Sequence, residues 1–391
     1  MTSRQKRLQI RKDLFSRVRR VVVKVGSGVI THDDGLNTRL IKRLAREISA
    51  LMDQGHQVIL VSSGAVASGM KKMDMAQRPA DIPHKQAIAA IGQPKLMLEY
   101  EKSFAHYQKK AAQILLTIDD LSNRRRYLNA RNTINVLLDW RIVPIINEND
   151  TVVVEELKFG DNDNLSAMIT HLMDAQILIN LTDIDGFYDK DPRSHKDAAL
   201  IPLVSRIDRA MEKAALDIPG AFGIGGMSSK IQTAKKVTTS GIPMVVASGL
   251  KANILKRLFA GRDVGTLFLP RSEKMGSRKC WIGFTLKAKG TIRVDRGAAK
   301  AMFKQGRSLL PIGILDVEGD FGVGAAVSCI DPDGVAFARG LVNYTASDIR
   351  KLVGVKTHQI EQRLGYKHYD EVIHRDNLVI IVDEKGGPIC Q

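Results

Sequence analysis

Residues 21–28 read Val-Val-Val-Lys-Val-Gly-Ser-Gly, a short β-branched run that ends in a lysine and two glycines. Similar apolar runs recur along the chain as far as about residue 270, and helical patterns separate them. Near-continuous hydrophobicity is typical of strands buried on both faces of a parallel sheet, and strands that alternate with helices are typical of βαβ units. The sequence therefore predicts an α/β fold, a three-layer α/β/α sandwich around a mostly parallel open sheet.

The predicted strands are 21–25, 58–61, 113–116, 142–146, 177–181 and 244–247. The predicted helices are 38–54, 86–106, 124–139, 164–173 and 228–240. These elements assign residues 21–270 to one large domain, preceded by a basic arm at 1–20.

The pattern changes after Pro270. Residues 271–279 are polar, and we assign 271–289 to a linker. Short strand patterns at 291–294, 313–317, 326–330 and 335–340 follow, together with a helix at 347–352 that Ser347 is placed to cap. We expect a small, mostly β barrel over 290–372 and a C-terminal tail at 373–391.

Composition is consistent with two domains and excludes several classes of protein. The chain has 391 residues, of which 44% are hydrophobic, enough for two buried cores. No run of about 18 apolar residues occurs, so we expect no helix that spans a membrane. The three cysteines and nine histidines are scattered, without CxxC or HExxH spacing, so we expect neither a disulfide framework nor a metal site made by the protein. A reducing, cytoplasmic location fits this composition.

The net charge of +17 is concentrated at the start of the chain. Residues 1–20 hold eight basic residues and one acid, whereas residues 277–391 carry a net charge of only +4. The arm is as arginine-rich as an organelle transit peptide but is not serine-rich, so we expect an ordinary solvated helix. Nucleic-acid binding usually needs a concentrated basic stripe, which disfavours an RNA-binding protein. A weak RNA contact through the C-terminal domain or the arm stays open.

Ligands of an open parallel sheet collect outside the carboxyl ends of its strands. After the first strand, Lys24 stands beside Gly26 and Gly28, whose backbone N–H groups phosphate oxygens can approach. The spacing is neither GxGxxG nor a Walker A loop. After the second strand, Ser62-Ser63-Gly64-Ala65 leads into a helix. This segment is either a simple helix cap or a site for an anion such as a carboxylate.

Two further loops have the composition of a nucleotide site. Residues 223–230 read Gly-Ile-Gly-Gly-Met-Ser-Ser-Lys and run into a helix that carries Lys230. A glycine-rich loop of this kind cradles polyphosphate with backbone donors, while the lysine supplies a mobile positive charge. Thr182 and Asp183 follow the fifth predicted strand, in a position to contact a nucleotide. These loops predict a nucleoside triphosphate as a ligand.

Two clusters of amide and carboxylate side chains follow the fourth strand. Residues 147–150 read Asn-Glu-Asn-Asp, residues 160–164 read Gly-Asp-Asn-Asp-Asn, and residues 152–159 between them predict a β excursion. An asparagine donates to a carboxylate and accepts from an ammonium, as recognition of an α-amino acid requires. We expect Asn147 to take part in this site, Asp150 to bind the substrate ammonium and Asn162 to bind a carboxylate.

The order of these motifs resembles the glutamate 5-kinase family of the amino acid kinase superfamily. The motifs are Lys-Val-Gly at 24–26, Ser-Ser-Gly-Ala at 62–65, Asn-Glu-Asn-Asp at 147–150, Gly-Asp-Asn-Asp-Asn-Leu-Ser-Ala at 160–167, Thr-Asp at 182–183 and Gly-Gly-Met-Ser-Ser-Lys at 225–230. The resemblance covers nearly the whole chain from Val21, and the C-terminal part resembles the PUA domain that many bacterial members carry. Two features depart from the family: Ile224 stands where threonine is more usual, and the basic arm lies outside the pattern.

The resemblance implies roles for the matching residues. Lys24 and Lys230 are implied to flank the transferred phosphoryl group, with Asp161 and Asp163 supporting catalysis. The implied ATP-binding residues are Lys24, Thr182, Asp183, Ile224, Gly225, Gly226, Met227, Ser228, Ser229 and Lys230.

The implied activity is ATP-dependent phosphorylation of the side-chain carboxylate of L-glutamate, the first step of proline biosynthesis. Positions that match Ser63, Asp150 and Asn162 bind glutamate in this family, and ATP enters as a co-substrate with Mg²⁺. A carboxylate is already an anionic nucleophile at neutral pH, so no general base is needed. The labile acyl phosphate product implies hand-over to glutamyl phosphate reductase, and we expect a homo-oligomer.

Two alternatives stay open on the sequence. One is another member of the superfamily, acting on aspartate, N-acetylglutamate, carbamate or a nucleoside monophosphate; the paired clusters and the PUA-like tail disfavour it. The other is an RNA-binding or RNA-modifying protein whose identity lies in its tail, which the charge distribution disfavours.

Overall fold

The computed structural model describes residues 2–32, 35–153, 162–216, 226–270 and 274–381. The chain divides into two compact units, Met1–Lys274 and Met275–Gln391, and each is treated by itself. Among the described helices, none is long and apolar enough to cross a membrane.

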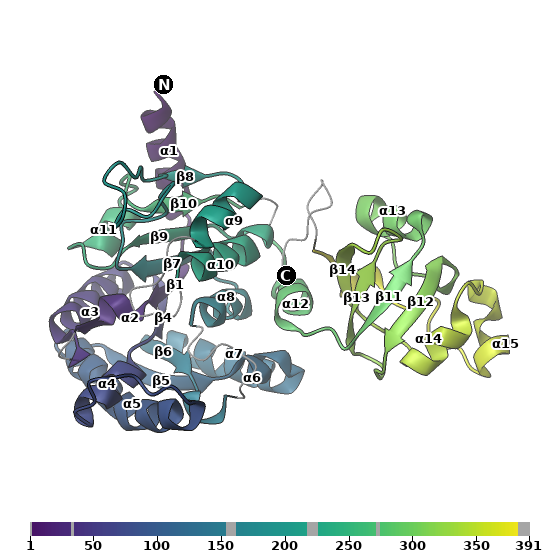
Figure 1. Cartoon of the computed structure of the whole chain (residues 1–391), viewed down its shortest axis with the longest axis horizontal. Coiled ribbons are helices and arrows are strands. Elements are labelled where there is room, and N and C mark those ends of the chain that lie inside the picture. The colour runs from purple at the N-terminus through teal and green to yellow at the C-terminus, as the bar shows by residue number, and fades with distance from the viewer. Residues whose placement is uncertain (1, 33–34, 154–161, 217–225, 271–273, 382–391) are drawn as a thin grey trace. The chain divides into compact units, whose positions relative to one another are not determined.

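The first unit is built on an eight-stranded sheet with the order β5-β6-β4-β1-β7-β9-β10-β8 (Figure 1). Its strands are β1 (Arg20–Val25), β4 (Gln57–Ser62), β5 (Lys110–Leu116), β6 (Ile142–Glu148), β7 (Ile177–Thr182), β8 (Leu203–Val204), β9 (Met244–Ser248) and β10 (Thr266–Phe268). Two further strands, β2 (Thr31–His32) and β3 (Gly35–Leu36), pair with each other. All neighbouring strands of the large sheet are parallel except β9 and β10, which confirms the predicted mostly parallel sheet.

The helices of this unit are α1 (Ser3–Phe15), α2 (Ser27–Ile30), α3 (Thr38–Asp53), α4 (Ala65–Lys72), α5 (Ile82–Ala105), α6 (Ile118–Ser122), α7 (Arg124–Asp139), η1 (Asp150–Val152), α8 (Asn162–Leu172), α9 (Arg209–Leu216), α10 (Met227–Thr239) and α11 (Ile254–Phe259). Helices cover both faces of the sheet, with α3 on one face and α8 and α10 on the other (Figure 1). The predicted α/β/α sandwich is therefore confirmed.

Three differences from the predicted elements have local causes. Helix α5 begins earlier than expected because Asp81 caps it by accepting from the backbone N–H of His84, and a proline occupies its first turn. Strands β8 and β10 were not predicted, because they are too short to give a recognisable sequence pattern. The β excursion expected at 152–159 falls outside the described residues from 154 onward, and Val152 belongs to the 3₁₀ turn η1.

The basic arm is a helix, but it is not simply solvated. Arg11 of α1 is fully buried and donates to the backbone carbonyls of Pro202, Val264 and Gly265. Phe15 is buried in the same core as the sheet. A buried arginine is stable here because its terminal N–H groups find acceptors and its Nε lies 3.4 Å from Asp263 Oδ1. The sequence of the arm alone does not reveal these partners.

Alternation along β1 divides its side chains between the two faces of the sheet. Val21, Val23 and Val25 pack in the core that contains the apolar face of α3. Lys24 lies on the opposite face, where it meets α8. One strand therefore supplies both a core layer and a charged group near its carboxyl end.

The second unit contains a five-stranded sheet with the order β12-β11-β13-β14-β15. The strands are β11 (Gly290–Val294), β12 (Ile314–Gly319), β13 (Ala326–Ile330), β14 (Ala336–Leu341) and β15 (Leu378–Ile380). The helical elements are α12 (Ser277–Cys280), η2 (Trp281–Thr285), α13 (Arg296–Gln305), η3 (Pro311–Gly313), α14 (Ala346–Leu352), η4 (Thr357–Gln359), α15 (Ile360–Leu364) and η5 (Arg375–Asn377). The expected small, mostly β domain is confirmed.

Three details of the second unit differ from expectation. Thr345, not Ser347, caps α14 by accepting from the backbone N–H of Asp348. Residues 277–285, assigned to the linker, are helical, and Trp281 is buried. Strand β15, which lies in the expected tail, pairs with β14 and so belongs to the sheet.

Candidate active site

The carboxyl ends of β1, β4, β6 and β7 bring several sequence-predicted residues to one edge of the sheet. Lys24 of β1 is in register with Asn180 of β7 on one side and with Val61 of β4 on the other. Helix α8 begins at this edge, and its first two residues are Asn162 and Asp163. Parallel strands necessarily gather their C-terminal residues at the same edge, so groups far apart in sequence meet here.

The first group is a charged cluster centred on Asp163. Its Oδ1 lies 2.6 Å from Nζ of Lys24, and its Oδ2 lies 3.4 Å from Nζ of Lys230. Asn180 Nδ2 donates to Oδ1 over 2.7 Å, and Ser229 Oγ donates to Oδ2 over 2.8 Å. We call Lys24, Asp163, Asn180, Ser229 and Lys230 the lysine cluster. The sequence predicted four of its five members.

The electrostatics of the lysine cluster keep Asp163 ionised. Burial by itself would raise the pKa of the Asp163 carboxyl, but the charges of Lys230 and Lys24 and the hydrogen bonds from Lys24 and Asn180 hold it well below its ordinary value. The two lysines and the aspartate are all nearly inaccessible to solvent. Two buried cations thus share one buried anion at the edge of the sheet.

The second group is a network of amides and a hydroxyl. Asn162 Nδ2 donates to Asn147 Oδ1 and to Ser63 Oγ, both over 3.0 Å. Asn147 Nδ2 in turn donates to Gln93 Oε1 of α5 over 2.9 Å. We call Ser63, Gln93, Asn147 and Asn162 the amide cluster. It joins β4, α5, β6 and α8.

The backbone of Glu148 sets the direction of every hydrogen bond in the amide cluster. Its N–H, which can only donate, lies 2.9 Å from Asn147 Oδ1 and so identifies that atom as the acceptor. Asn162 must then present its Nδ2 to Asn147. This leaves Asn162 Oδ1 buried and without a hydrogen-bond partner among the described residues. Ser63 Oγ accepts from Asn162, so its own hydroxyl hydrogen stays available to an outside acceptor.

The close crossing of helices α4 and α5 brings Gln93 of α5 into contact with Asn147 of the amide cluster. Helices α4 and α5 cross where Gly69 meets Gly92, and a Cβ on Gly92 would lie only 1.9 Å from the carbonyl oxygen of Ala65. Only glycine permits that approach. Gly64, the residue before α4, has a φ of 114°, a conformation that also favours glycine, and the turn leaves Ser63 partly exposed just after β4.

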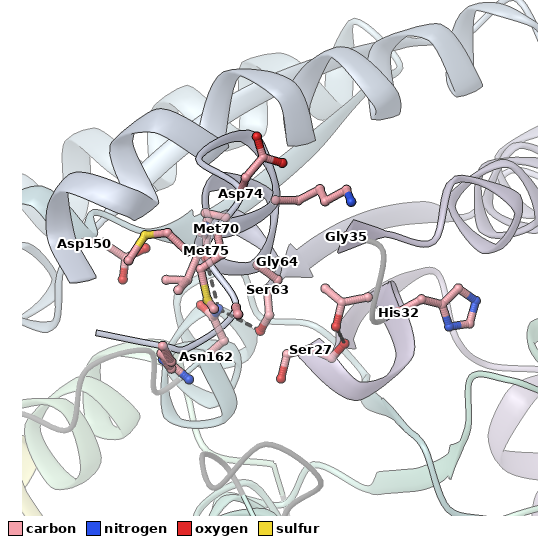
Figure 2. Close-up of a pocket in the computed structure, with 18 residues that line it drawn as sticks. Ser27, His32, Gly35, Ser63, Gly64, Met70, Asp74, Met75, Asp150 and Asn162 are labelled. Carbon is pink, nitrogen blue, oxygen red and sulfur yellow. Dashed lines mark hydrogen bonds between the residues drawn. The ribbon is translucent and has the colours of Figure 1, made fainter. Parts of the chain in front are cut away.

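A cavity of about 650 Å³ lies against the amide cluster. Figure 2 shows Ser63 and Asn162 on one side of it, with Met70 and Met75 close by and Asp150 beyond them. Its lining residues are Ser27, Thr31, His32, Gly35, Ser63, Gly64, Ala65, Val66, Ala67, Met70, Lys71, Asp74, Met75, Ala76, Arg78, Asn147, Asp150 and Asn162. The four residues predicted to bind the substrate all line this one cavity.

Asp150 is the buried acid of the cavity. Burial raises its pKa to about 6, and the positive charge of Arg78 opposes that rise. The carboxylate is therefore ionised at neutral pH and available to a cation. Its position at the start of η1, two residues after the end of β6, places it on the lining of the same cavity as Asn147.

The residues predicted to bind ATP are only partly described. Thr182 is buried at the end of β7 and donates to Asp183 Oδ1 over 2.9 Å. Gly226 precedes α10, whose first residues are Met227 and Ser228. The predicted site residues Asp161, Ile224 and Gly225 lie outside the described residues.

Three site residues were not predicted: Gln93, Asn180 and Arg78. Asn180 had a usable signal, because it is a polar residue within the otherwise apolar strand Ile177–Leu181. Gln93 sits on the buried side of α5, where a long helix with mixed composition gives no such contrast. Arg78 lies in a connecting segment, where an arginine is unremarkable in sequence.

The chain is similar to known protein families and to individual relatives. The model of the amino acid kinase family matches residues 19–248, and the PUA domain model matches residues 290–364. A glutamate 5-kinase of Syntrophus aciditrophicus is 51% identical over 371 residues, which cover 95% of this chain and 96% of that protein. The chain belongs to the glutamate 5-kinase family. A glutamate 5-kinase of Geobacter metallireducens is 52% identical over 373 residues, covering 95% of this chain and all of that protein.

The resemblance drawn from the six motifs is therefore confirmed for the glutamate 5-kinase family, including its PUA domain. Among solved structures, a UMP kinase from Bacillus anthracis aligns with a TM-score of 0.45 at 17% identity. That alignment covers 65% of this chain and 97% of the other.

Proposed function

We propose that this chain carries out the glutamate 5-kinase reaction, the ATP-dependent phosphorylation of the L-glutamate side-chain carboxylate that begins proline biosynthesis. The observation that carries the proposal is the junction at the start of α8. There Asn162 faces the cavity and Asp163 holds two lysines, so an amino-acid site and a phosphoryl site adjoin.

The lysine cluster suits transfer between two anions. A carboxylate needs no general base, so the barrier lies in bringing it against the negatively charged γ-phosphoryl group. Lys24 and Lys230 offset charge that develops on the transferred group and hold it in line. Because their environment is buried, their charges act more strongly than they would in water.

Asp163 positions the lysines and does not act as a base. Both of its oxygens are occupied by donors, and its pKa is held below the ordinary range, so it remains an anion throughout. It fixes the Nζ atoms of Lys24 and Lys230 on either side of one carboxylate. Preorganised charges of this kind need no rearrangement when the reaction occurs.

The cavity binds the amino acid by the polarity of its lining. Asn162 Oδ1 and the Asp150 carboxylate are acceptors, so they bind the α-ammonium group. The Ser63 hydroxyl is a donor and binds a carboxylate of the substrate. In this scheme Asn162 binds the ammonium group, whereas its sequence context suggested a carboxylate.

ATP binds at the end of the site formed by Lys24, Thr182, Asp183 and the start of α10. Backbone N–H groups at the N-terminus of α10 favour phosphate oxygens, and Ser228 and Ser229 lie in that first turn. Mg²⁺ enters chelated by ATP, as is usual for a phosphoryl-transfer co-substrate. We keep Asp161, Ile224 and Gly225 in this site as predictions from the family resemblance.

Several further expectations belong to this proposal. Residues 21–270 form the catalytic domain, and residues 290–372 form an accessory domain that can make a weak RNA contact. The enzyme works in the cytoplasm as a homo-oligomer. It passes its acyl phosphate product to glutamyl phosphate reductase, because an acyl phosphate hydrolyses readily in water.

A hydroxylamine-trapping assay tests the proposed function. The purified chain is supplied with Mg-ATP and, in separate reactions, with L-glutamate, L-aspartate, N-acetyl-L-glutamate or UMP. We expect an ATP-dependent hydroxamate with L-glutamate and a much weaker signal with the other acids. Absence of hydroxamate with L-glutamate would overturn the proposal, and ADP formation with UMP alone would favour a nucleotide kinase.

A further inference from the structure

Arg78 lines the same cavity as the amide cluster but has no role in the scheme above. It lies in the segment between α4 and α5 and is half-buried. Both ends of the segment are anchored. The backbone N–H of Met75 donates to the carbonyl of Met70 over 2.9 Å, and Asp81 caps α5. The guanidinium is therefore held at the cavity by ordered backbone on both sides.

The guanidinium of Arg78 lacks the partners that buried arginines usually have. Its Nε is buried and makes no hydrogen bond with the described residues. Arg11, the buried arginine of α1, also has an Nε without a hydrogen bond, but its terminal N–H groups donate to three backbone carbonyls. An arginine N–H group that is shielded from water without an acceptor costs free energy, so a ligand that supplies an acceptor is favoured.

Arg78 and Asp150 form a pair of opposite charges on the wall of this cavity. Burial lowers the pKa of Arg78, and Asp150 opposes that effect, while Arg78 in turn opposes the rise in the pKa of Asp150. The other charged lining residues are exposed: His32, Lys71 and Asp74. Within the described part of the chain, the half-buried cation of this cavity is thus Arg78.

An α-amino acid carries one positive and one negative charge at its α-carbon. Asp150 and Asn162 Oδ1 supply acceptors for the α-ammonium, so the α-carboxylate needs a cation nearby. Lys24 and Lys230 do not fill this need, because Asp163 holds both and the proposed reaction assigns them to the phosphoryl group.

We propose that Arg78 binds the α-carboxylate of L-glutamate and so selects substrates that carry a free carboxylate at the α-carbon. The inference rests on the proposed function and names a residue that determines its substrate specificity. The planar guanidinium matches a carboxylate with two parallel N–H donors, which a lysine at this position would not reproduce. With the α-carbon fixed between Arg78 and Asp150, the side-chain carboxylate is free to extend toward the lysine cluster.

The test compares L-glutamate with L-isoglutamine, which keeps the α-ammonium and the side-chain carboxylate but has an amide in place of the α-carboxylate. Hydroxamate formation is measured for the wild-type chain, Arg78→Gln and Arg78→Lys. Lys72→Gln, an exposed cation of α4 outside the cavity lining, is the matched control. The KM for ATP and the thermal unfolding midpoint are measured for each variant.

We expect the wild-type chain to prefer L-glutamate strongly. Arg78→Gln should lower kcat/KM for L-glutamate by about 10- to 100-fold, the usual size of a lost charged hydrogen bond, and should change kcat/KM for L-isoglutamine little. Arg78→Lys should lie between, and Lys72→Gln should match the wild type. The KM for ATP should stay the same throughout.

Two outcomes would overturn the inference while leaving the proposed function intact. One is an equal loss on both substrates in Arg78→Gln, and the other is a wild-type chain that uses L-isoglutamine as well as L-glutamate. The second measurement needs no variant, so it stands even if Arg78→Gln does not fold. A wild-type chain that forms no hydroxamate with L-glutamate would instead overturn the proposed function itself.

Discussion

Lys24 Nζ lies 2.6 Å from Asp163 Oδ1, and both side chains are almost completely buried. A buried ion pair is rarely a source of net stability, because desolvation of the two charges offsets their attraction. This one carries a second lysine as well, so a single buried carboxylate is shared by two cations. Such an arrangement is expected where the charge serves chemistry rather than folding.

Replacement of Lys230 by methionine should separate activity from stability. The substitution leaves Asp163 paired with Lys24, a neutral pair, so the midpoint of thermal unfolding should not fall by more than a few degrees. Turnover should fall by at least about 100-fold, because one of the two cations beside the phosphoryl group is gone. Steady-state kinetics and a thermal melt measure both quantities. Lys235→Met on the same helix is the control, and near-normal turnover of Lys230→Met would refute its role.

Asp163→Asn, unlike Lys230→Met, should lose stability as well as activity. Two buried lysines would then lack their shared anion, which we expect to cost about 3 to 5 kcal/mol of unfolding free energy. Denaturant unfolding measures the difference. Because the folded state lowers the pKa of Asp163, its stabilising effect is present above the ordinary aspartate pKa of about 4 and is lost as the pH falls below it. The gap between wild type and variant should therefore narrow under acid, and a constant gap would argue against the ion pair.

Gln93→Leu tests the amide cluster from a residue that does not touch the cavity. Loss of the Gln93 acceptor leaves Asn147 Nδ2 unpaired and frees the orientation of Asn162, so the KM for glutamate should rise about tenfold. Gln93→Glu keeps an acceptor at the same place and should behave more like the wild type. The KM for ATP should not change in either variant. An equal rise in the KM values for glutamate and ATP would indicate a general packing defect and contradict the prediction. Asn162→Ala, which removes the amide of Asn162 itself, shows how large the effect on the KM for glutamate is when the cluster is disrupted directly.

Glutamate affinity should depend on pH through Asp150. Its pKa is raised to about 6, so the carboxylate is ionised above that pH and protonated below it. A protonated Asp150 no longer attracts the α-ammonium, and the KM for glutamate should rise about tenfold for each pH unit below 6. The substrate's own side-chain carboxylate titrates near 4.3, well below this range. Initial rates between pH 5 and 8 measure the effect, and a profile of Asp150→Asn with the same inflection would assign it to another group.

Local sequence patterns were sufficient for much of the fold. All six strands predicted for the large domain formed. Five of them are apolar runs that the parallel sheet buries, and the sixth, β5, is a partly exposed strand at the edge of the sheet. The N-terminal arm at 1–20 was expected to be an ordinary solvated helix, and this was wrong for Arg11 because its burial depends on distant residues. Its arginines look like solvated charges, and the burial of Arg11 depends on carbonyl groups about 190 and 250 residues away.

The sequence by itself determined the family, the sheet and most of the chemical groups, because motifs such as those around Lys24 and Lys230 are local strings. Only the tertiary structure decided which of two adjacent residues, Asn162 or Asp163, contacts which cluster. Asn162 faces the amide cluster and Asp163 faces the lysine cluster, since successive residues at a helix start point in different directions. The free oxygen of Asn162 is a further example. Its identity depends on a chain of hydrogen bonds through residues distant in sequence, and no local pattern contains that information.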